Sequence, residues 1–409
     1  MVAIWPTSRK LRLSDSLNVQ ARLITAAGGS LQVSIGSSTM LSGRYASAAS
    51  AALLFCALAS VARSSEVNIA VVGPMSGSSA AFGAQMRDGA AVAVEALNAS
   101  GLLLDTKVIL SVADDACDPK QAVAVANKLT TERVRLVVGH FCSSSSIPAS
   151  GIYEEAGIIQ MSPGSSNPQL TERGLESVFR ICGRDDQQGI VAAEYIHRNF
   201  PNDKIAVLDD KSTAGKGIAD VVEAQLRRFG EQVIRQSYVA GEKDYRALVS
   251  RMKKDRVRVA YIGGYHTEIG LFVRQASEAR AGLIVMASDP LMTSEFWAIT
   301  GSAGNGTLFT FMPDPARNAN AAGVVAKLKA SNLSAEGYTL YAYAAVQAWA
   351  EAVIRTGSFN AVRVASALRS RPTDTVIGPV RFDTKGDNAA PGFLVYRWRD
   401  GRVETVEQN

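Results

Sequence analysis

Along most of the chain, short runs of β-branched residues alternate with longer stretches in which apolar residues recur at helical spacing. The first unit shows the pattern. Residues 67–72 are an almost continuous apolar run, residues 73–77 interrupt it, and Ala90, Val94 and Leu97 then recur on one face of a helix. Apolar strands separated by helices are typical of a parallel sheet that is covered on both faces. The chain is therefore predicted to have an α/β fold.

The predicted strands form two series of similar size, which indicates two doubly wound lobes. The first series comprises residues 67–72, 108–112, 136–138, 158–161 and 178–181. The second comprises residues 205–208, 233–239, 259–262, 283–286 and 308–311. After Pro313 the pattern is mainly helical, most clearly over residues 342–354, and strands return at 380–382 and 393–398. Such a tail fits a chain that crosses back to complete the first lobe.

The positive charge of the chain is concentrated at its N-terminus. Six of the 43 basic residues but only one of the 38 acidic residues lie in residues 1–65, which leaves 37 of each sign in residues 66–409. A nucleic-acid surface needs a basic excess that this body lacks. We therefore expect no nucleic-acid partner.

The first 62 residues are predicted to be a leader that carries an export signal. Arg44 precedes an apolar run over residues 46–58, and small residues at positions −3 and −1 place cleavage after Ala62. A membrane anchor is the alternative, but the run falls short of the roughly 20 apolar residues that span a bilayer. The signal is compact if translation starts at Met40, which we expect to be the true start.

Three cysteines remain after cleavage: Cys117, Cys142 and Cys182. In an exported protein this odd number predicts one disulfide and one free thiol, and Cys182 is expected to be buried. No C-x-x-C pair or nearby histidine completes a tetrahedral set, so no metal is expected. Cys56 could be read as a lipid attachment site, but Phe55 stands where a small residue is needed.

The chain lacks the motifs of the common enzyme classes. No serine of the body has glycine on both sides at two residues' distance, and neither a phosphate-binding loop nor H-E-x-x-H occurs. Structural roles are expected for His140, His197 and His266. The acidic pairs 114–115 and 209–210 end predicted strands, where they could serve acid/base chemistry or cap loops. We favour loop capping and expect neither an enzyme nor a cofactor.

Two serine-rich loops are the best candidates for a binding site. Residues 139–146 follow one strand and lead into a helix, so hydroxyl groups and free backbone N–H groups coincide at a positive helix end. Residues 161–168 repeat this arrangement after the next strand. Open α/β sheets bind ligands at the carboxyl ends of their strands, and a carboxylate would suit this place. Either loop taken alone could be a simple turn.

Longer strings of the sequence resemble one known family. The string D-D-A-C-D-P-K-Q-A-V-A-V-A-N-K over residues 114–128, G-H-x-C-S-S-S from Gly139, A-G-E-K-D from Ala240 and G-G-Y-H from Gly263 are similar to those of the branched-chain amino acid (Leu/Ile/Val) binding proteins. These are type I periplasmic solute-binding proteins of ABC importers. The resemblance covers residues 67–398.

The resemblance implies a type I periplasmic-binding-protein fold, with two lobes joined by three crossovers that close over one amino acid. On this reading, residues 66–184 and 314–388 form lobe 1. Residues 185–313 and 389–409 form lobe 2. The body is expected to be periplasmic and monomeric.

The family's contacts to the ligand backbone map onto five residues. The resemblance implies that Ser143 and Ser166 bind the ligand α-carboxylate and that Tyr265 contributes from the other lobe. The α-ammonium would be bound by the carbonyl of Gly164, by Ser166 and by Asp289. The family usually has glutamate at this last position, so the shorter arm of Asp289 is a departure.

The side-chain pocket departs further from the family. The resemblance places Phe82, Phe141, Ala214 and Tyr338 around the ligand side chain, although both phenylalanines could equally be core packing. Ala214 stands where a pocket tyrosine is expected. The loss of that tyrosine opens space, which favours a bulkier aliphatic or an aromatic amino acid.

The resemblance also implies a disulfide between Cys117 and Cys142 and a partner, the membrane permease subunits of an ABC importer. The expected function is capture of a branched-chain or other hydrophobic amino acid by lobe closure and its delivery to that permease. The alternative is an amino-acid-sensing receptor or regulator with the same fold.

Overall fold

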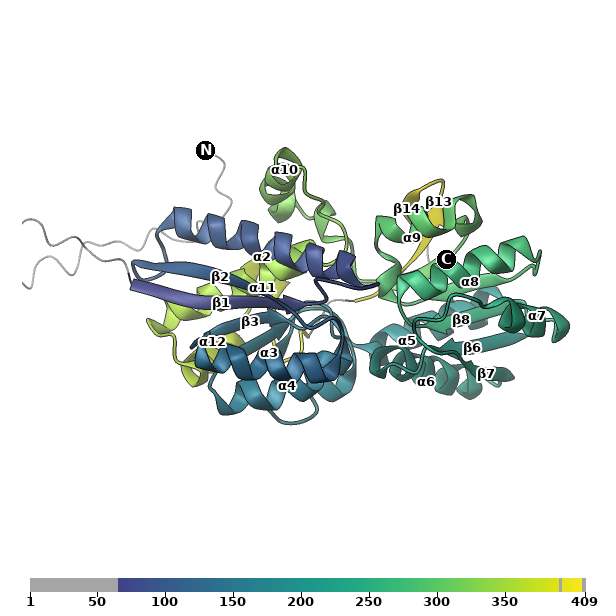
Figure 1. Cartoon of the computed structure of the whole chain (residues 1–409), viewed down its shortest axis with the longest axis horizontal. Coiled ribbons are helices and arrows are strands. Elements are labelled where there is room, and N and C mark those ends of the chain that lie inside the picture. Colours follow the sequence, from purple (N-terminus) through teal and green to yellow (C-terminus); the bar gives the residue numbers. More distant parts are fainter. Residues whose placement is uncertain (1–64, 390–391, 407–409) are drawn as a thin grey trace, which may run out of the picture. The chain divides into compact units, whose positions relative to one another are not determined.

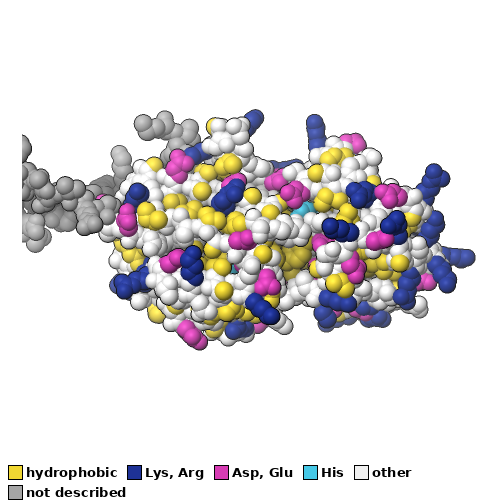
Figure 2. All heavy atoms as spheres, in the orientation of Figure 1, with side chains coloured by type: hydrophobic (Ala, Val, Ile, Leu, Met, Phe, Trp, Pro, Cys, Tyr) yellow, Lys and Arg dark blue, Asp and Glu magenta, His cyan; other side chains and the backbone are white. Residues whose placement is uncertain are grey.

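The computed structural model describes residues 65–389 and 392–406 (Figure 1). The predicted leader, the cleavage site at Ala62 and the start at Met40 lie outside these residues. Among the described residues, no helix is both long enough and apolar enough to cross a membrane. On the face shown in Figure 2, basic and acidic side chains are interspersed.

The first lobe is built on a five-stranded sheet with the order β2-β1-β3-β4-β5. Its strands are β1 (Ser65–Gly73), β2 (Thr106–Asp114), β3 (Leu136–Gly139), β4 (Ile159–Ser162) and β5 (Val178–Arg180). The pairings β1–β3, β3–β4 and β4–β5 are parallel. The β3 and β4 strands are buried along their whole length, which explains their unbroken apolar sequences.

Helices cover both faces of the first sheet. The helices of the first lobe are α2 (Ala80–Ser100), α3 (Pro119–Thr131), α4 (Ser143–Glu155), α10 (Ala322–Ala330), α11 (Thr339–Thr356) and α12 (Ala361–Ser370). Helix α2 packs against α11 on one face, and α3 packs against α4 on the other (Figure 1). Helix α11 is buried on nearly all sides, so its continuous apolar sequence is that of a core helix.

The second lobe is built on a seven-stranded sheet with the order β14-β13-β10-β9-β8-β6-β7. Its strands are β6 (Ile205–Asp209), β7 (Val233–Ser237), β8 (Val259–Gly263), β9 (Ile284–Ala287), β10 (Leu308–Phe311), β13 (Leu394–Arg399) and β14 (Arg402–Thr405). The pairings from β10 to β7 are parallel, whereas β13 and β14 add antiparallel strands. Its helices are α5 (Asp185–Asn199), α6 (Thr213–Arg228), α7 (Arg246–Lys254), α8 (His266–Glu278) and α9 (Ser294–Thr300).

The chain passes between the two sheets three times: from β5 to α5, from β10 back toward α11, and from the tail of the first lobe to β13. The predicted α/β architecture with two doubly wound lobes and three crossovers is therefore confirmed. The residue ranges expected for the two lobes remain a prediction.

One predicted strand differs from the structure. Residues 380–382 were expected to form a strand, but β12 (Gly378–Val380) ends there after pairing with β11 (Thr373–Thr375) in a separate two-stranded sheet. Phe382 then makes only an isolated bridge with Asn388. Val380 and Phe382 are buried although they do not extend the main sheet. Their burial alone explains the alternating apolar pattern that predicts a strand here.

Candidate functional site

A cavity lies at the carboxyl ends of the strands of both sheets, where the chain leaves β3, β4, β6, β8 and β9. This is the edge at which open α/β sheets bind ligands. Among the residues that the structure describes, no lysine, arginine or histidine lines the cavity. The lining residues are Phe141, Ser143, Gly164, Ser166, Asp185, Ala214, Gly215, Ile218, Gly264, Tyr265, Ser288, Asp289 and Pro290.

The first lobe contributes the two serine-rich loops to the wall. Ser143 is the first residue of α4, so its hydroxyl group lies at the positive N-terminal end of this helix. Its Oγ accepts a hydrogen bond from the backbone N–H of Asn167 at 3.3 Å, which ties the two loops together. Ser166, which belongs to the second loop, also lines the cavity. A positive helix end with nearby hydroxyl groups can bind a carboxylate.

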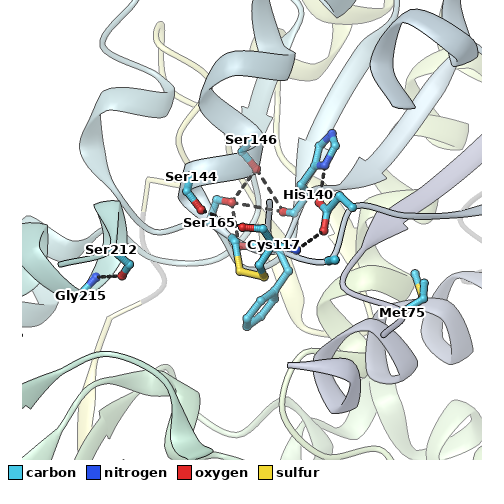
Figure 3. Close-up of a disulfide and its surroundings, with 12 residues drawn as sticks. Met75, Cys117, His140, Ser144, Ser146, Ser165, Ser212 and Gly215 are labelled. Carbon is cyan, nitrogen blue, oxygen red and sulfur yellow. Dashed lines mark hydrogen bonds and ion pairs between the residues drawn. A yellow bond between two sulfur atoms is a disulfide. The ribbon is translucent and has the colours of Figure 1, made fainter. Parts of the chain in front are cut away.

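Buried serines hold the loops in place around the carbonyl oxygen of His140 (Figure 3). The hydroxyl groups of Ser146, Ser162 and Ser165 donate to this oxygen at 3.3, 2.7 and 3.2 Å. Ser165 also donates to the carbonyl oxygen of Phe141 at 2.8 Å. Three of the seven serines in these loops therefore build the scaffold, whereas Ser143 and Ser166 are the loop serines that line the cavity among the described residues.

A disulfide joins Cys117 to Cys142, the residue directly before α4, so the predicted pairing is confirmed (Figure 3). Asp118 caps α3 by accepting from two backbone N–H groups of its first turn, which fixes the loop on the other side of the bridge. Cys182 is free and buried, as predicted, and burial raises the pKa of its thiol. The disulfide thus anchors the start of the helix that carries Ser143.

The second lobe supplies the opposite wall. Ala214 and Ile218 lie on the first turns of α6, Tyr265 precedes α8, and Ser288 and Asp289 follow β9. The position of Gly215 requires glycine, because a Cβ atom there would lie 2.2 Å from a carboxylate oxygen of Asp210. The backbone of α6 can therefore approach the end of β8 closely, which shapes this part of the wall.

Two acidic side chains face the cavity and are almost completely buried: Asp185 is 1% exposed and Asp289 is 5% exposed. Burial and the nearby Asp289 raise the pKa of Asp185 to about 7, although Ser166 and Arg180 act in the opposite direction. One carboxylate oxygen of Asp185 has no hydrogen-bond partner in the described part of the chain. Two such acids without a neighbouring cation in the wall are suited to a positively charged group.

Asp289 is held in place from the first lobe. The hydroxyl group of Tyr338 donates a short hydrogen bond to its carboxylate. Burial raises the pKa of Asp289, although hydrogen bonds from Tyr338 and Gln188 act to lower it. Two hydrogen bonds thus connect the lobes near the cavity: this one, and that from the side-chain amide of Asn167 to the carbonyl oxygen of Thr213 at 2.9 Å.

An aromatic cluster lies behind the cavity wall. Phe82 stacks on Phe141 with ring centroids 4.4 Å apart, and Tyr338 contacts Phe141 edge to face at 4.9 Å. Phe141 in turn packs directly on Gly164, where a Cβ atom would lie 2.4 Å from its ring. Of the four residues predicted to surround the ligand side chain, Phe141 and Ala214 line the cavity, while Phe82 and Tyr338 support it from behind.

The structure brings together every residue predicted to contact the ligand backbone, and their roles stay predictions. Sequence reasoning missed Asp185, Ile218 and Ser288. Asp185 is the first residue of α5, which follows β5, just as Ser143 is the first residue of α4, which follows β3. This shared position at the start of a helix after a strand is the sequence signal that could have identified Asp185. An acidic residue in a first helical turn is otherwise explained by the helix dipole alone.

None of the three histidines lines the cavity. His140 is fully buried between Asp115, 2.6 Å from its Nδ1, and Tyr153, 2.9 Å from its Nε2. His197 pairs with Glu231 at 2.7 Å and His266 with Glu295 at 2.9 Å. The cavity wall therefore offers carboxylates and hydroxyl groups but no imidazole to activate a serine.

The acidic pairs at the strand ends take part in loop structure. Asp114 accepts hydrogen bonds from the backbone of Met75 and Ala116, each at 2.8 Å. Partial burial acts to raise the pKa of Asp114, but these bonds and that from Ser76 hold it below its ordinary value. Asp210 accepts from the backbone N–H of Ser212 at 2.9 Å. Both interactions are those of loop-capping side chains.

The chain is similar to known proteins over most of its length. The model of a family described as periplasmic binding protein matches residues 66–402. The "Amino acid binding protein" of Pseudomonas aeruginosa is 45% identical over 82% of this chain and 91% of its own length. The "Leu/Ile/Val-binding protein homolog 1" of Brucella suis is 41% identical over 82% and 92%. A leucine binding protein structure from Thermotoga maritima has a TM-score of 0.78 and 27% identity, covering 83% of this chain and 98% of that one.

Proposed function

The chain belongs to the periplasmic binding protein family, and from this premise we propose that it is the periplasmic substrate-binding protein of an ABC importer for a hydrophobic amino acid. The observation that carries the proposal is the charge pattern of the cavity. A helix N-terminus with two serines lies on one side and two buried carboxylates lie on the other, with no basic side chain among the described residues of the wall. A zwitterion is complementary to both ends.

At the first end, the ligand α-carboxylate binds the start of α4. The hydroxyl groups of Ser143 and Ser166 and the backbone N–H groups of the first turn donate to its oxygens, and Tyr265 donates from the second lobe. The pKa of Tyr265 is raised well above its ordinary value, chiefly by burial and also by Asp210, so its hydroxyl group stays protonated and can donate. No basic side chain of the wall is needed.

At the second end, the α-ammonium lies against Asp185 and Asp289 and donates to the carbonyl oxygen of Gly164 and to Ser166. The ammonium gives the free oxygen of Asp185 a hydrogen-bond partner and places a positive charge beside both buried carboxylates, which favours their charged form. A molecule without an amino group leaves one oxygen of Asp185 without a partner and both acids without a positive charge in the cavity, which is a basis for rejection. Asp185 thus joins the predicted ammonium ligands.

The apolar part of the wall indicates a hydrophobic ligand side chain. Phe141, Ala214 and Ile218 form this part, and the curated relatives carry names of Leu/Ile/Val-binding proteins. The small side chain of Ala214 leaves room for a larger ligand than valine. We therefore place phenylalanine beside leucine, isoleucine and valine as candidates.

Binding is coupled to closure of the two lobes, because each lobe supplies only part of the contacts. The ligand binds the closed state better than the open one and shifts the population toward it. The closed form then docks on the membrane permease. In this account the protein performs no chemistry on its ligand, which fits a cavity wall without histidine, and an N-terminal signal directs it to the periplasm.

The proposal is tested on residues 63–409 after bound ligand has been removed by unfolding and refolding. Thermal unfolding is measured with each of the twenty amino acids, and a ligand at 100 times its dissociation constant adds about 2.7 kcal/mol to stability. We expect a clear shift with one or more of leucine, isoleucine, valine and phenylalanine, and none with acidic amino acids. The absence of a shift with every amino acid would contradict the proposal.

A further inference from the structure

A fully buried arginine lies directly behind the first-lobe wall of the cavity. Arg180 is the last residue of β5, and its side chain is 0% exposed. One guanidinium nitrogen donates to the carbonyl oxygens of Ser165 and Asn167 at 2.9 and 2.8 Å. These are the residues on either side of Ser166. The arginine therefore fixes the backbone from which Ser166 faces the cavity.

The charge of Arg180 is balanced from the far end of the chain. Its Nε donates to Asp387 at 2.9 Å, and Asp387 also receives hydrogen bonds from Arg184 and Thr171. Burial acts to raise the pKa of Asp387, but the two arginines and Thr171 hold it below its ordinary value, so the carboxylate stays charged. A buried ion pair of this kind is tolerable because every charge is satisfied.

The same ion pair joins two of the three crossovers. The backbone of Arg180 pairs with residues 386–388, since its N–H donates to Gly386 at 2.8 Å and its carbonyl oxygen accepts from Asn388 at 3.0 Å. The chain continues from Arg180 into α5 and from residue 388 toward β13, both in the second lobe. Arg180 thus connects the loop that carries Ser166 to the first residues of two crossovers.

We infer that Arg180 is a positioning residue for ligand binding, which keeps the Ser165–Asn167 loop in the geometry that receives the ligand and links this loop to the crossovers. Arg180 does not line the cavity: it reaches the ligand site through its hydrogen bonds to the loop, and its charge also acts on Asp185. The inference rests on the proposed function, because it requires that the ligand bind in this cavity. A site whose supporting residues are lost becomes too loose to bind well even when its own residues are present.

The test compares the dissociation constant of the wild-type protein with that of Arg180→Met, measured by calorimetry at 25 °C with leucine. If leucine gives no thermal shift, the amino acid with the largest shift is used. Methionine has a similar length but cannot donate to the two carbonyl oxygens. Because Arg180→Met leaves Asp387 with one arginine fewer, the double variant Arg180→Met/Asp387→Asn is measured as well. Removing both charges avoids the poorly balanced Asp387 carboxylate without restoring the loop contacts, although Arg184 also loses an ion pair.

We expect the double variant to unfold at a temperature closer to that of the wild type than Arg180→Met does, and both variants to bind at least about tenfold more weakly than the wild type. Arg180→Lys, which can still donate to the carbonyl oxygens, should recover part of the affinity. Arg369→Met is the matched control, because Arg369 contacts Phe179 of the same strand and the carbonyl oxygen of Thr384 but not the cavity loop. Its affinity should stay within about twofold of wild type.

If the double variant folds and its affinity for the amino acid stays within twofold of the wild-type value, the inference is overturned and the proposed function is left intact. If the wild type binds no amino acid, the proposed function fails first and the role of Arg180 fails with it. The two failures are therefore distinguished by the wild-type titration alone.

Discussion

Ligand binding should expel a proton from Asp185. In the ligand-free protein the pKa of this residue is about 7, because the carboxyl group is buried and lies near Asp289. A bound ammonium favours the charged carboxylate, so the proton must leave on binding. At pH 6.5 about three-quarters of the free protein carries this proton, which predicts release of about three-quarters of a proton per ligand.

The affinity follows from the same protonation equilibrium. For a pKa near 7 in the free protein and a low pKa in the complex, the dissociation constant should rise about tenfold from pH 8 to pH 6. The stability of the free protein has its own pH dependence. The folded pKa of Asp185 lies above the ordinary value of 3.8, so its stabilising contribution is complete below pH 3.8 and is lost as the pH rises toward 7.

Titration calorimetry in two buffers of different ionisation enthalpy measures the released protons directly. Asp185→Asn should remove most of the release, and any remainder comes from Asp289, whose pKa is also raised, first by burial. The neighbouring Asp186→Asn is the control, because Asp186 pairs with Arg184 outside the cavity and its pKa is lowered, chiefly by this arginine. Equal proton release by the wild type and Asp185→Asn would refute the reasoning.

Three further changes test the site in other ways. Ser143→Ala should raise the dissociation constant roughly tenfold to a hundredfold by calorimetry, because a hydrogen bond to a charged group is lost, whereas Ser144→Ala should bind like the wild type. Ala214→Tyr fills the space beside the ligand side chain, so the affinity for phenylalanine should fall more than that for valine in a competition titration; an equal loss for both would contradict this placement. Replacing Cys117 and Cys142 by serine opens a bridge between residues 25 apart and should lower the free energy of unfolding in urea by roughly 3–4 kcal/mol; an unchanged value would show that the bridge adds no stability.

The fold could be predicted from the sequence because each strand and helix leaves its own pattern of apolar residues in the chain. Strands such as β3 and β8 are buried along their whole length, and their unbroken apolar runs carry that burial directly. The serine-rich loops could be placed at the sheet edge for the same reason, since each directly follows such a strand. The second half of the tail was harder to predict, because the strand-like residues 380–382 are buried without joining the main sheet.

The parts that could not be predicted depend on contacts between distant residues. Arg180 ends a strand like many exposed arginines, and only the fold brings Asp387, 207 residues away, to its guanidinium group. Phe82 and Tyr338 are predicted around the ligand side chain; the fold places both rings against Phe141, a packing that the sequence alone does not specify. Asp185 was missed because a first-turn acid has an ordinary explanation that does not involve a ligand.

The central claim is that the cavity holds the two charged ends of a free amino acid. The most direct test is calorimetric titration of the stripped protein with the amino acid that gives the largest thermal shift, with its amide and with its deaminated acid. The account predicts that the amino acid binds and that both analogues fail to bind at concentrations 100 times higher than its dissociation constant, since each leaves one end of the cavity unpaired. Comparable binding of either analogue would contradict the account.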